Sequence, residues 1–121
     1  MDKLKQQIVA EMRVKPSIDP ASEISRRVNF IKETLKASGM TVLVLGISGG
    51  VDSSLCGRLC QIACDDLGEG YQFIAVRLPY GVQADEDDAQ LALSFIKPDI
   101  SLAINIKAGT DGIHESVMKS V

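Results

Sequence analysis

The chain has 121 residues, of which 45% are hydrophobic, so it can bury the core of one domain and is not a disordered sequence. Its net charge of −3 provides no basic surface for nonspecific nucleic acid binding. The first twelve residues are too charged for a secretory signal and the apolar runs are too short to cross a bilayer, so we expect a soluble, cytoplasmic protein with no membrane partner.

Two amphipathic helices are predicted before the first strand. In the first helix, Leu4, Ile8 and Met12 recur at the spacing of one helix face. The second helix is expected over residues 20–38, since an Asp-Pro pair precedes this stretch and a Ser-Gly pair closes it. Amphipathic faces usually pack inside a chain, but these two helices can equally form a dimer surface. The sequence does not choose between these arrangements.

From residue 41 onward, strands and helices alternate. Strands are expected at 41–46, 72–78 and 101–106, with helices at 52–67 and 84–96 between them. This order is typical of an α/β fold with a parallel sheet, in which ligands bind at the carboxyl ends of the strands. We therefore divide the chain into an N-terminal helical segment, 1–40, and an α/β domain, 41–121. The tail from residue 107 shows no finished pattern.

The loop after the first strand, Gly46 to Ser54, is predicted to bind phosphate. Its adjacent glycines let the backbone approach an anion, and the following helix start directs N–H groups toward it. It lacks the lysine of the P-loop nucleotide-binding motif. Ser48 and Ser53 can donate hydroxyl hydrogen bonds to phosphate oxygens. Asp52 would repel a phosphate but can hold Mg²⁺ that bridges phosphates; alternatively, Asp52 or Ser53 only caps the helix.

A second loop, from Arg77 to Gln83, follows the second strand and should face the same crevice. Arg77 is interpreted either as a nucleotide ligand, through stacking or phosphate pairing, or as a member of a surface ion pair. The acidic run at 85–88 is interpreted as opposing the positive dipole of the helix that it starts, in preference to a metal site.

Three cysteines, Cys56, Cys60 and Cys64, lie four residues apart in one predicted helix. An odd number at this spacing argues against a disulfide framework and agrees with a reducing compartment. We expect all three to line the packed face of the helix as small apolar residues. The single histidine, His114, is expected at the surface.

Residues 48–53, Ser-Gly-Gly-Val-Asp-Ser, are similar to the SGGxDS motif of the ATP pyrophosphatase superfamily. Longer runs narrow this resemblance to bacterial ammonia-dependent NAD synthetases, and they lie at 14–20, 27–32, 73–83, 85–88 and 95–99. The resemblance covers nearly the whole chain. It implies an adenine nucleotide alpha hydrolase-like, Rossmann-like parallel-sheet fold preceded by N-terminal helices.

The same resemblance implies a homodimeric ligase. Such an enzyme uses Mg-ATP to adenylylate the carboxylate of deamido-NAD, releases pyrophosphate, and lets ammonia displace AMP to give NAD. Asp52 is the implied magnesium ligand, and Arg77 with Gln83 the implied contacts to the nucleoside end of ATP. No side-chain nucleophile is implied, and no cysteine is needed. The residues implied to hold the ATP phosphates are Gly46, Ile47, Ser48, Gly49, Gly50, Val51, Asp52 and Ser53.

Members of this family are considerably longer than this chain. The resemblance therefore implies a truncated N-terminal portion that carries mainly the ATP half-site and does not perform the whole reaction unaided. Two other interpretations stay open. One is another ATP pyrophosphatase, such as a GMP synthetase, because the phosphate loop alone does not separate these enzymes. The other is a non-catalytic fragment that binds nucleotide weakly or associates through its N-terminal helices.

Overall fold

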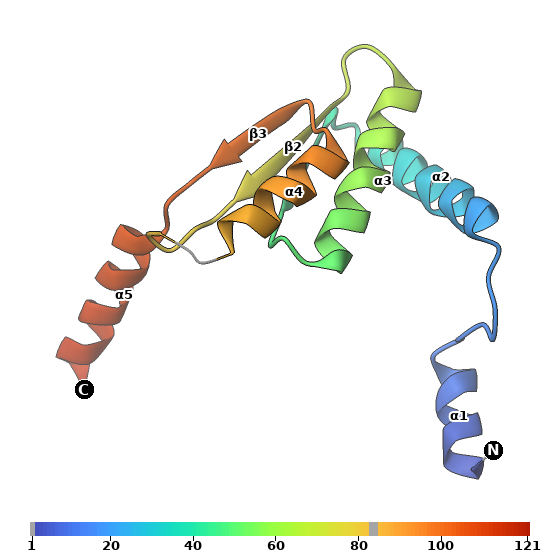
Figure 1. The fold of residues 1–121 in the computed structure, drawn as a ribbon, viewed down its shortest axis with the longest axis horizontal. Coiled ribbons are helices and arrows are strands. Elements are labelled where there is room, and N and C mark those ends of the chain that lie inside the picture. Colours follow the sequence, from blue (N-terminus) through green and yellow to red (C-terminus); the bar gives the residue numbers. More distant parts are fainter. Residues whose placement is uncertain (1, 83–84) are drawn as a thin grey trace.

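The computed structural model describes residues 2–82 and 85–121, so Gln83 lies outside the described residues. Figure 1 shows α2, α3 and α4 gathered against the sheet, whereas α1 and α5 project away from this body. Within the described residues, no helix combines the length and apolar character needed to cross a membrane. In chain order, the elements are α1 (Lys3–Glu11), α2 (Pro20–Ser38), β1 (Val42–Gly46), α3 (Val51–Leu67), β2 (Gln72–Arg77), α4 (Glu86–Ile96), β3 (Ile100–Ala103) and α5 (Lys107–Ser120).

The three described strands form one parallel sheet in the order β1-β2-β3. Side chains alternate between the two faces of such a strand. On β2, Phe73 and Ala75 are fully buried in the core beneath the helices. On the opposite face, Val44 and Leu102 are exposed. The structure thus confirms the predicted parallel α/β sheet, with its helices packed against one face.

Helix α3 lies at the centre of the core and contacts α2, α4, β1 and β2. At Gly57 it approaches the neighbouring elements closely. A Cβ atom at this position would lie 2.8 Å from Ile96 Cδ1 and 3.2 Å from Ile47 Cδ1. The absence of a side chain therefore lets α3 settle onto both the end of α4 and the residue that follows β1.

A partly buried polar network centred on Gln61 joins α3 to the amino ends of β2 and β3. The amide of Gln61, a residue only 2% exposed, donates to Asp65 Oδ1 at 2.8 Å and accepts the Asp99 backbone N–H at 2.9 Å. Asp99 Oδ2 in turn accepts the Phe73 N–H at 2.9 Å. Because each of these polar groups has a partner, the network fixes the position of α3 without leaving a buried donor or acceptor unpaired.

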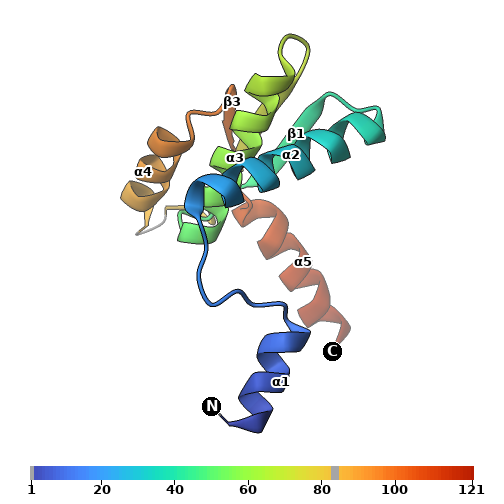
Figure 2. The same cartoon turned by 90° about the vertical axis from the view of Figure 1, so that its right-hand side faces the viewer.

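The two N-terminal helices differ in how they pack. Helix α2 matches its predicted bounds and ends at Gly39, whose φ of +73° is the left-handed conformation of a helix cap. Its Val28 and Leu35 are 4% exposed and pack against the core. Helix α1 has no buried residue, and Leu4 and Ile8 are exposed. Figure 2 shows α1 standing apart from the sheet and its helices, so intramolecular packing holds for α2 alone.

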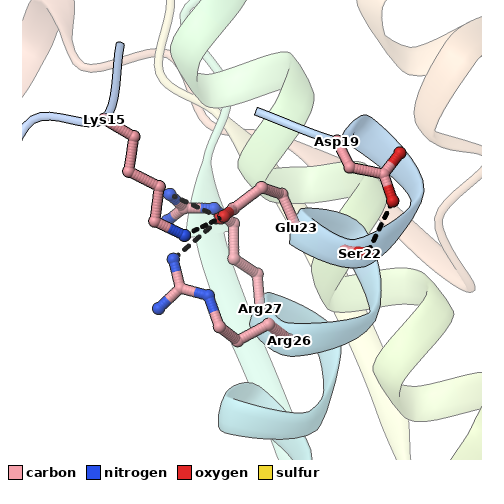
Figure 3. A network of polar contacts seen from close by, with 6 residues as sticks. All are labelled: Lys15, Asp19, Ser22, Glu23, Arg26 and Arg27. Carbon is pink, nitrogen blue, oxygen red and sulfur yellow. Dashed lines mark hydrogen bonds and ion pairs between the residues drawn. The ribbon is translucent and has the colours of Figure 1, made fainter. Parts of the chain in front are cut away.

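A cluster of charges surrounds Glu23 in the first turn of α2 (Figure 3). Its carboxylate accepts Lys15 Nζ at 2.5 Å and Arg26 Nη2 at 2.7 Å, and Arg27 Nη2 lies 3.5 Å away. The side chain of Glu23 is only 11% exposed. The hydrogen bond from Lys15, followed by that from Arg26, lowers the pKa of this carboxyl to about 2. The cluster therefore ties the segment that enters α2 to the helix itself.

Replacing Glu23 with glutamine should destabilise the chain near neutral pH and much less in acid. Because the pKa of this carboxyl is lowered from 4.5 to about 2, its stabilising effect is complete above pH 4.5 and is lost as the pH falls toward 2. Urea unfolding at roughly pH 7 and pH 3 measures the difference between Glu23→Gln and the parent chain. Glu33→Gln, on an exposed part of the same helix, is the control. An equal difference at both pH values would contradict this assignment.

Two parts of the C-terminal third differ from the sequence-based prediction. The third strand was expected over 101–106, but β3 ends at Ala103. The Ile104 and Ile106 N–H groups still donate to the carbonyls of Arg77 and Pro79, at 2.8 and 2.9 Å. However, β2 ends at Arg77, and the chain beyond it continues as a loop. The tail without a finished pattern is the helix α5. It has no buried residue, and its large apolar side chains Ile113, Val117 and Met118 are exposed.

Candidate functional site

A cavity of about 340 Å³ lies at the carboxyl ends of β1 and β2. One wall is the chain leaving β1, from Gly46 to Ser48, and the other is the chain leaving β2, from Val76 to Pro79. Asp85 and Ala89 close it from the start of α4. The prediction that the two loops share one crevice is confirmed, and the crevice stands where parallel sheets bind their ligands.

The loop between β1 and α3 is held in an open turn by its backbone. The Ile47 N–H donates to the Val76 carbonyl at 2.8 Å, which fixes the start of the loop to β2. Gly49 has a φ of +93°, a conformation that L side chains rarely adopt, and a Cβ there would lie 3.3 Å from the Ala89 backbone nitrogen. The glycine is therefore needed both for the turn and for the close approach of α4.

Helix α3 begins at Val51, with Gly50 as its N-cap residue. The first helical hydrogen bond runs from the Ser54 N–H to the Gly50 carbonyl, at 3.2 Å. The N–H groups before it have no partner within the helix, as at every helix start, and they carry the positive end of the helix dipole. This geometry suits an anion.

The two serines predicted to bind phosphate lie next to each other. Ser48 Oγ is 3.0 Å from Ser53 Oγ, and Ser53 Oγ also accepts the Ser48 N–H at 3.2 Å. Ser48 Oγ accepts the Gly50 N–H at 3.2 Å. These hydrogen bonds fix both hydroxyls beside the turn that precedes α3.

Asp52 is exposed in the first turn of α3, one residue after the helix begins. It is not the N-cap residue, and Gly50 in that position has no side chain to bond with. Among the described residues, no group of three or more His, Cys, Asp or Glu side chains could hold a metal ion. A metal held by Asp52 would therefore take its other ligands from outside these residues, and phosphate oxygens of a bound ligand can supply them, as in magnesium sites made of one carboxylate and phosphate oxygens.

Arg77 ends β2 and is only 8% exposed. Its guanidinium pairs with the carboxylate of Glu86 in the first turn of α4. The hydrogen bond from Gln90, followed by that from Arg77, lowers the pKa of the Glu86 carboxyl. The ion pair foreseen as one alternative is present; its arginine is buried and lines the cavity, whereas Glu86 is exposed. A role for Arg77 in nucleotide binding remains a prediction, and Gln83, its predicted companion, lies outside the described residues.

The acidic run lies at the start of α4, with Asp85 as the N-cap residue and the other three members in the first turn. This placement agrees with the helix-dipole interpretation. One member does more than the sequence suggested, since Glu86 also pairs with Arg77.

The cysteines divide into two kinds. Cys60 and Cys64 are buried, and burial raises their pKa values to about 12 and about 11. They are therefore inert thiols in the packed face of α3. Cys56 is exposed, so the expectation that all three line the packed face is wrong for this residue. No described cysteine forms a disulfide. His114 is exposed on α5, as expected.

Asn105 was missed as a residue that shapes the site. Its Oδ1 accepts the Gly81 N–H of the second loop at 3.1 Å and the Lys107 N–H at 2.9 Å. The available signal was a lone Asn shortly after a strand, which often accepts backbone N–H groups near a turn. This signal was overlooked because the third strand was expected over 101–106, which places Asn105 within the strand and not after it.

The model of the NAD synthase family matches residues 23–120 of this sequence. The chain belongs to the NAD synthase family. The match confirms the family resemblance, and it includes both loops that line the cavity as well as α2 from Glu23 onward.

Similar proteins agree with this membership of the NAD synthase family. The NH₃-dependent NAD⁺ synthetase of Aliivibrio salmonicida is 64% identical over 118 residues, which are 93% of this chain and 43% of that protein. Its counterpart in Vibrio campbellii is 65% identical over 116 residues, 92% of this chain and 42% of that protein. A crystal structure of NAD⁺ synthetase from Burkholderia pseudomallei superposes with a TM-score of 0.85 at 38% identity, covering 95% of this chain and 43% of that one. The chain thus spans less than half the length of these relatives.

Proposed function

We propose that this chain provides the ATP-binding part of an ammonia-dependent NAD synthetase. The proposed reaction joins ammonia to deamido-NAD at the expense of ATP and gives NAD, AMP and pyrophosphate. The observation that carries the proposal is the glycine- and serine-rich loop, Gly46 to Ser53, in a chain of this family: its first residues, Gly46 to Ser48, line the cavity, and its last residues form the start of α3. A helix start of this kind is suited to the phosphates of ATP.

In the proposed reaction, a carboxylate oxygen of deamido-NAD attacks the α-phosphorus of ATP, and pyrophosphate leaves. Ammonia then attacks the acyl carbon, AMP leaves, and a proton is released. The chain contributes by orienting ATP: backbone N–H groups and the Ser48 and Ser53 hydroxyls hold phosphate oxygens, and Arg77 with Gln83 contacts the nucleoside end. Alignment and charge stabilisation supply the acceleration, so no side-chain nucleophile is required.

Asp52 is the proposed protein ligand for Mg²⁺. Its support is an exposed carboxylate beside the phosphate-binding turn, where a metal would share phosphate oxygens. Bound Mg²⁺ would neutralise charge on the leaving pyrophosphate. Asp52 would hold this metal beside the amides of the loop.

We further propose that the protein is a cytoplasmic homodimer. The exposed side chains of Leu4 and Ile8 on α1 and of Met12, its C-cap residue, support self-association, because this helix has no buried residue of its own. The free cysteines agree with a reducing compartment. We retain the division into an N-terminal helical segment, 1–40, and an α/β segment, 41–121.

The test is a chimera in which this chain replaces the matching part of the Aliivibrio salmonicida protein. With Mg-ATP, deamido-NAD and ammonium, it should form NAD, AMP and pyrophosphate in equal amounts. Asp52→Ala should slow NAD formation by about a hundredfold or more, while its circular dichroism spectrum stays unchanged. The 121-residue chain, assayed alone, should form no NAD. A folded chimera that is silent while the intact relative is active would refute the proposal.

A further inference from the structure

The second loop of the cavity is attached to the segment between β3 and α5. Two backbone bonds join them, from Ile104 N–H to the Arg77 carbonyl at 2.8 Å and from Ile106 N–H to the Pro79 carbonyl at 2.9 Å. In Figure 1, α5 begins next to the loop that leaves β2. The wall formed by Leu78 and Pro79 therefore rests on a second segment of chain from a distant part of the sequence.

Asn105 is the side chain that completes this attachment. Its Oδ1 accepts the Gly81 N–H at 3.1 Å and the Lys107 N–H at 2.9 Å, so one atom joins the loop to the first residue of α5. Gly81 has a φ of +65°, and a Cβ there would lie 3.5 Å from Lys107 Cδ. The chain is held in this left-handed turn directly beyond the residues that line the cavity.

The next residues reinforce the same junction. The Tyr80 hydroxyl donates to Asp111, and Lys107 Nζ lies 2.5 Å from Asp111 Oδ2. Lys107 Nζ also stands 5.4 Å from the centre of the Tyr80 ring. Because Tyr80, Lys107 and Asp111 are at least partly exposed, each of these contacts is weak alone. Asn105 differs, since it holds the backbone itself.

We propose that Asn105 is a positioning residue for ATP. It fixes the loop that forms one wall of the cavity, and through that wall it sets the space for the nucleoside end of ATP. The phosphate-binding loop belongs to the opposite wall, whereas the hydrogen bonds of Asn105 are to Gly81 and Lys107. This inference rests on the proposed function. It predicts that Asn105 affects the binding of ATP, which has a nucleoside, and not the binding of inorganic triphosphate, which has none.

Loss of the side chain should leave the fold intact. Asn105 is exposed, so the N–H groups released by Asn105→Ala can bond to water, and no buried donor is left unpaired. Asn105→Asp keeps an Oδ1 acceptor in the same place and should restore ATP binding.

Asp111→Ala and Glu115→Ala form a matched pair on α5. Each variant removes an ion pair between residues four apart in sequence, but of these two residues only Asp111 contacts the loop.

The experiment measures binding of Mg-ATP and of Mg-triphosphate to the 121-residue chain by calorimetry. Asn105→Ala should raise the Kd for ATP roughly tenfold and leave the Kd for triphosphate unchanged, since the wall on the nucleoside side loses the two hydrogen bonds that hold its backbone in position and ATP binding must then order it. Asn105→Asp should bind ATP like the parent, and Asp111→Ala should weaken ATP binding where Glu115→Ala does not. Unchanged ATP binding in Asn105→Ala, or equal weakening for both ligands, would overturn the inference. If the parent chain binds neither ligand, the proposed function fails as well.

Discussion

Replacing Gly57 with valine should lower the free energy of unfolding by about 3 kcal/mol, the upper part of the range for an overpacked core. Even a Cβ at this position would lie 2.8 Å from Ile96 Cδ1, and Ile96 is fully buried, so it has little room to move. The two γ-methyl groups of valine would push α3 away from α4 and from Ile47. Since a domain of this size is stable by only about 5–15 kcal/mol, the loss is severe.

Thermal unfolding followed by circular dichroism measures this effect, and the midpoint should fall by on the order of 10 °C. Gly112→Val is the matched control, because Gly112 also lies inside a helix but a Cβ there would meet no atom within 4 Å. That variant should unfold close to the parent. A Gly57→Val chain as stable as the Gly112→Val chain would mean that α3 does not pack as closely as described.

Replacing Gly49 with alanine should weaken Mg-ATP binding at least about tenfold. The alanine would have to keep a φ near +93°, which costs an L residue roughly 1–2 kcal/mol, and its Cβ would press on the Ala89 backbone at 3.3 Å. We therefore expect the turn at residue 49 to change to a backbone conformation that alanine adopts without strain. Its amides and the Ser48 hydroxyl would then no longer converge on the phosphates.

Gly70→Ala separates this effect from general strain. Gly70 has nearly the same φ, +90°, but a Cβ there has open space and the residue lies in the turn before β2, away from the cavity. Both variants should lose a similar amount of stability, and only Gly49→Ala should lose ATP affinity in calorimetric titration. Equal affinities for ATP in the two variants would show that the loop conformation does not matter for binding.

Local signals predicted much of the fold. The bounds of α2 were readable because Pro20 and Gly39 are strong helix boundary residues, and β1 and β2 were readable as apolar runs next to glycines and charged residues. The phosphate-binding turn was predictable for the same reason: Gly49 has no substitute in that backbone conformation.

Contacts between distant parts of the sequence were not predictable. An ion pair at Arg77 was one alternative, but its partner Glu86, which lies beyond the loop between β2 and α4, was not foreseen. The acidic run around Glu86 already had a sufficient local explanation in the helix dipole. Helix α5 was missed because it buries nothing and includes two glycines, which lower helix propensity. Asn105 was missed with it, since its role depends on the turn at Gly81, far earlier in the sequence.

The cysteines show the same limit on a smaller scale. Their spacing of four residues predicts one face of α3, and the structure agrees for Cys60 and Cys64. Cys56 lies one turn closer to the helix start, beyond the edge of the core cluster. Spacing specifies a face of a helix but not how far along that face the packing extends.

ATP is proposed to bind with its phosphates on the turn between β1 and α3. The most direct measurement is to follow backbone amide resonances of the 121-residue chain by NMR while Mg-ATP is added. The amides of Gly49 to Ser53 should shift most, and Asp52→Ala should suppress their response. Shifts confined to other parts of the chain, or saturable ATP binding that leaves these amides unmoved, would contradict it.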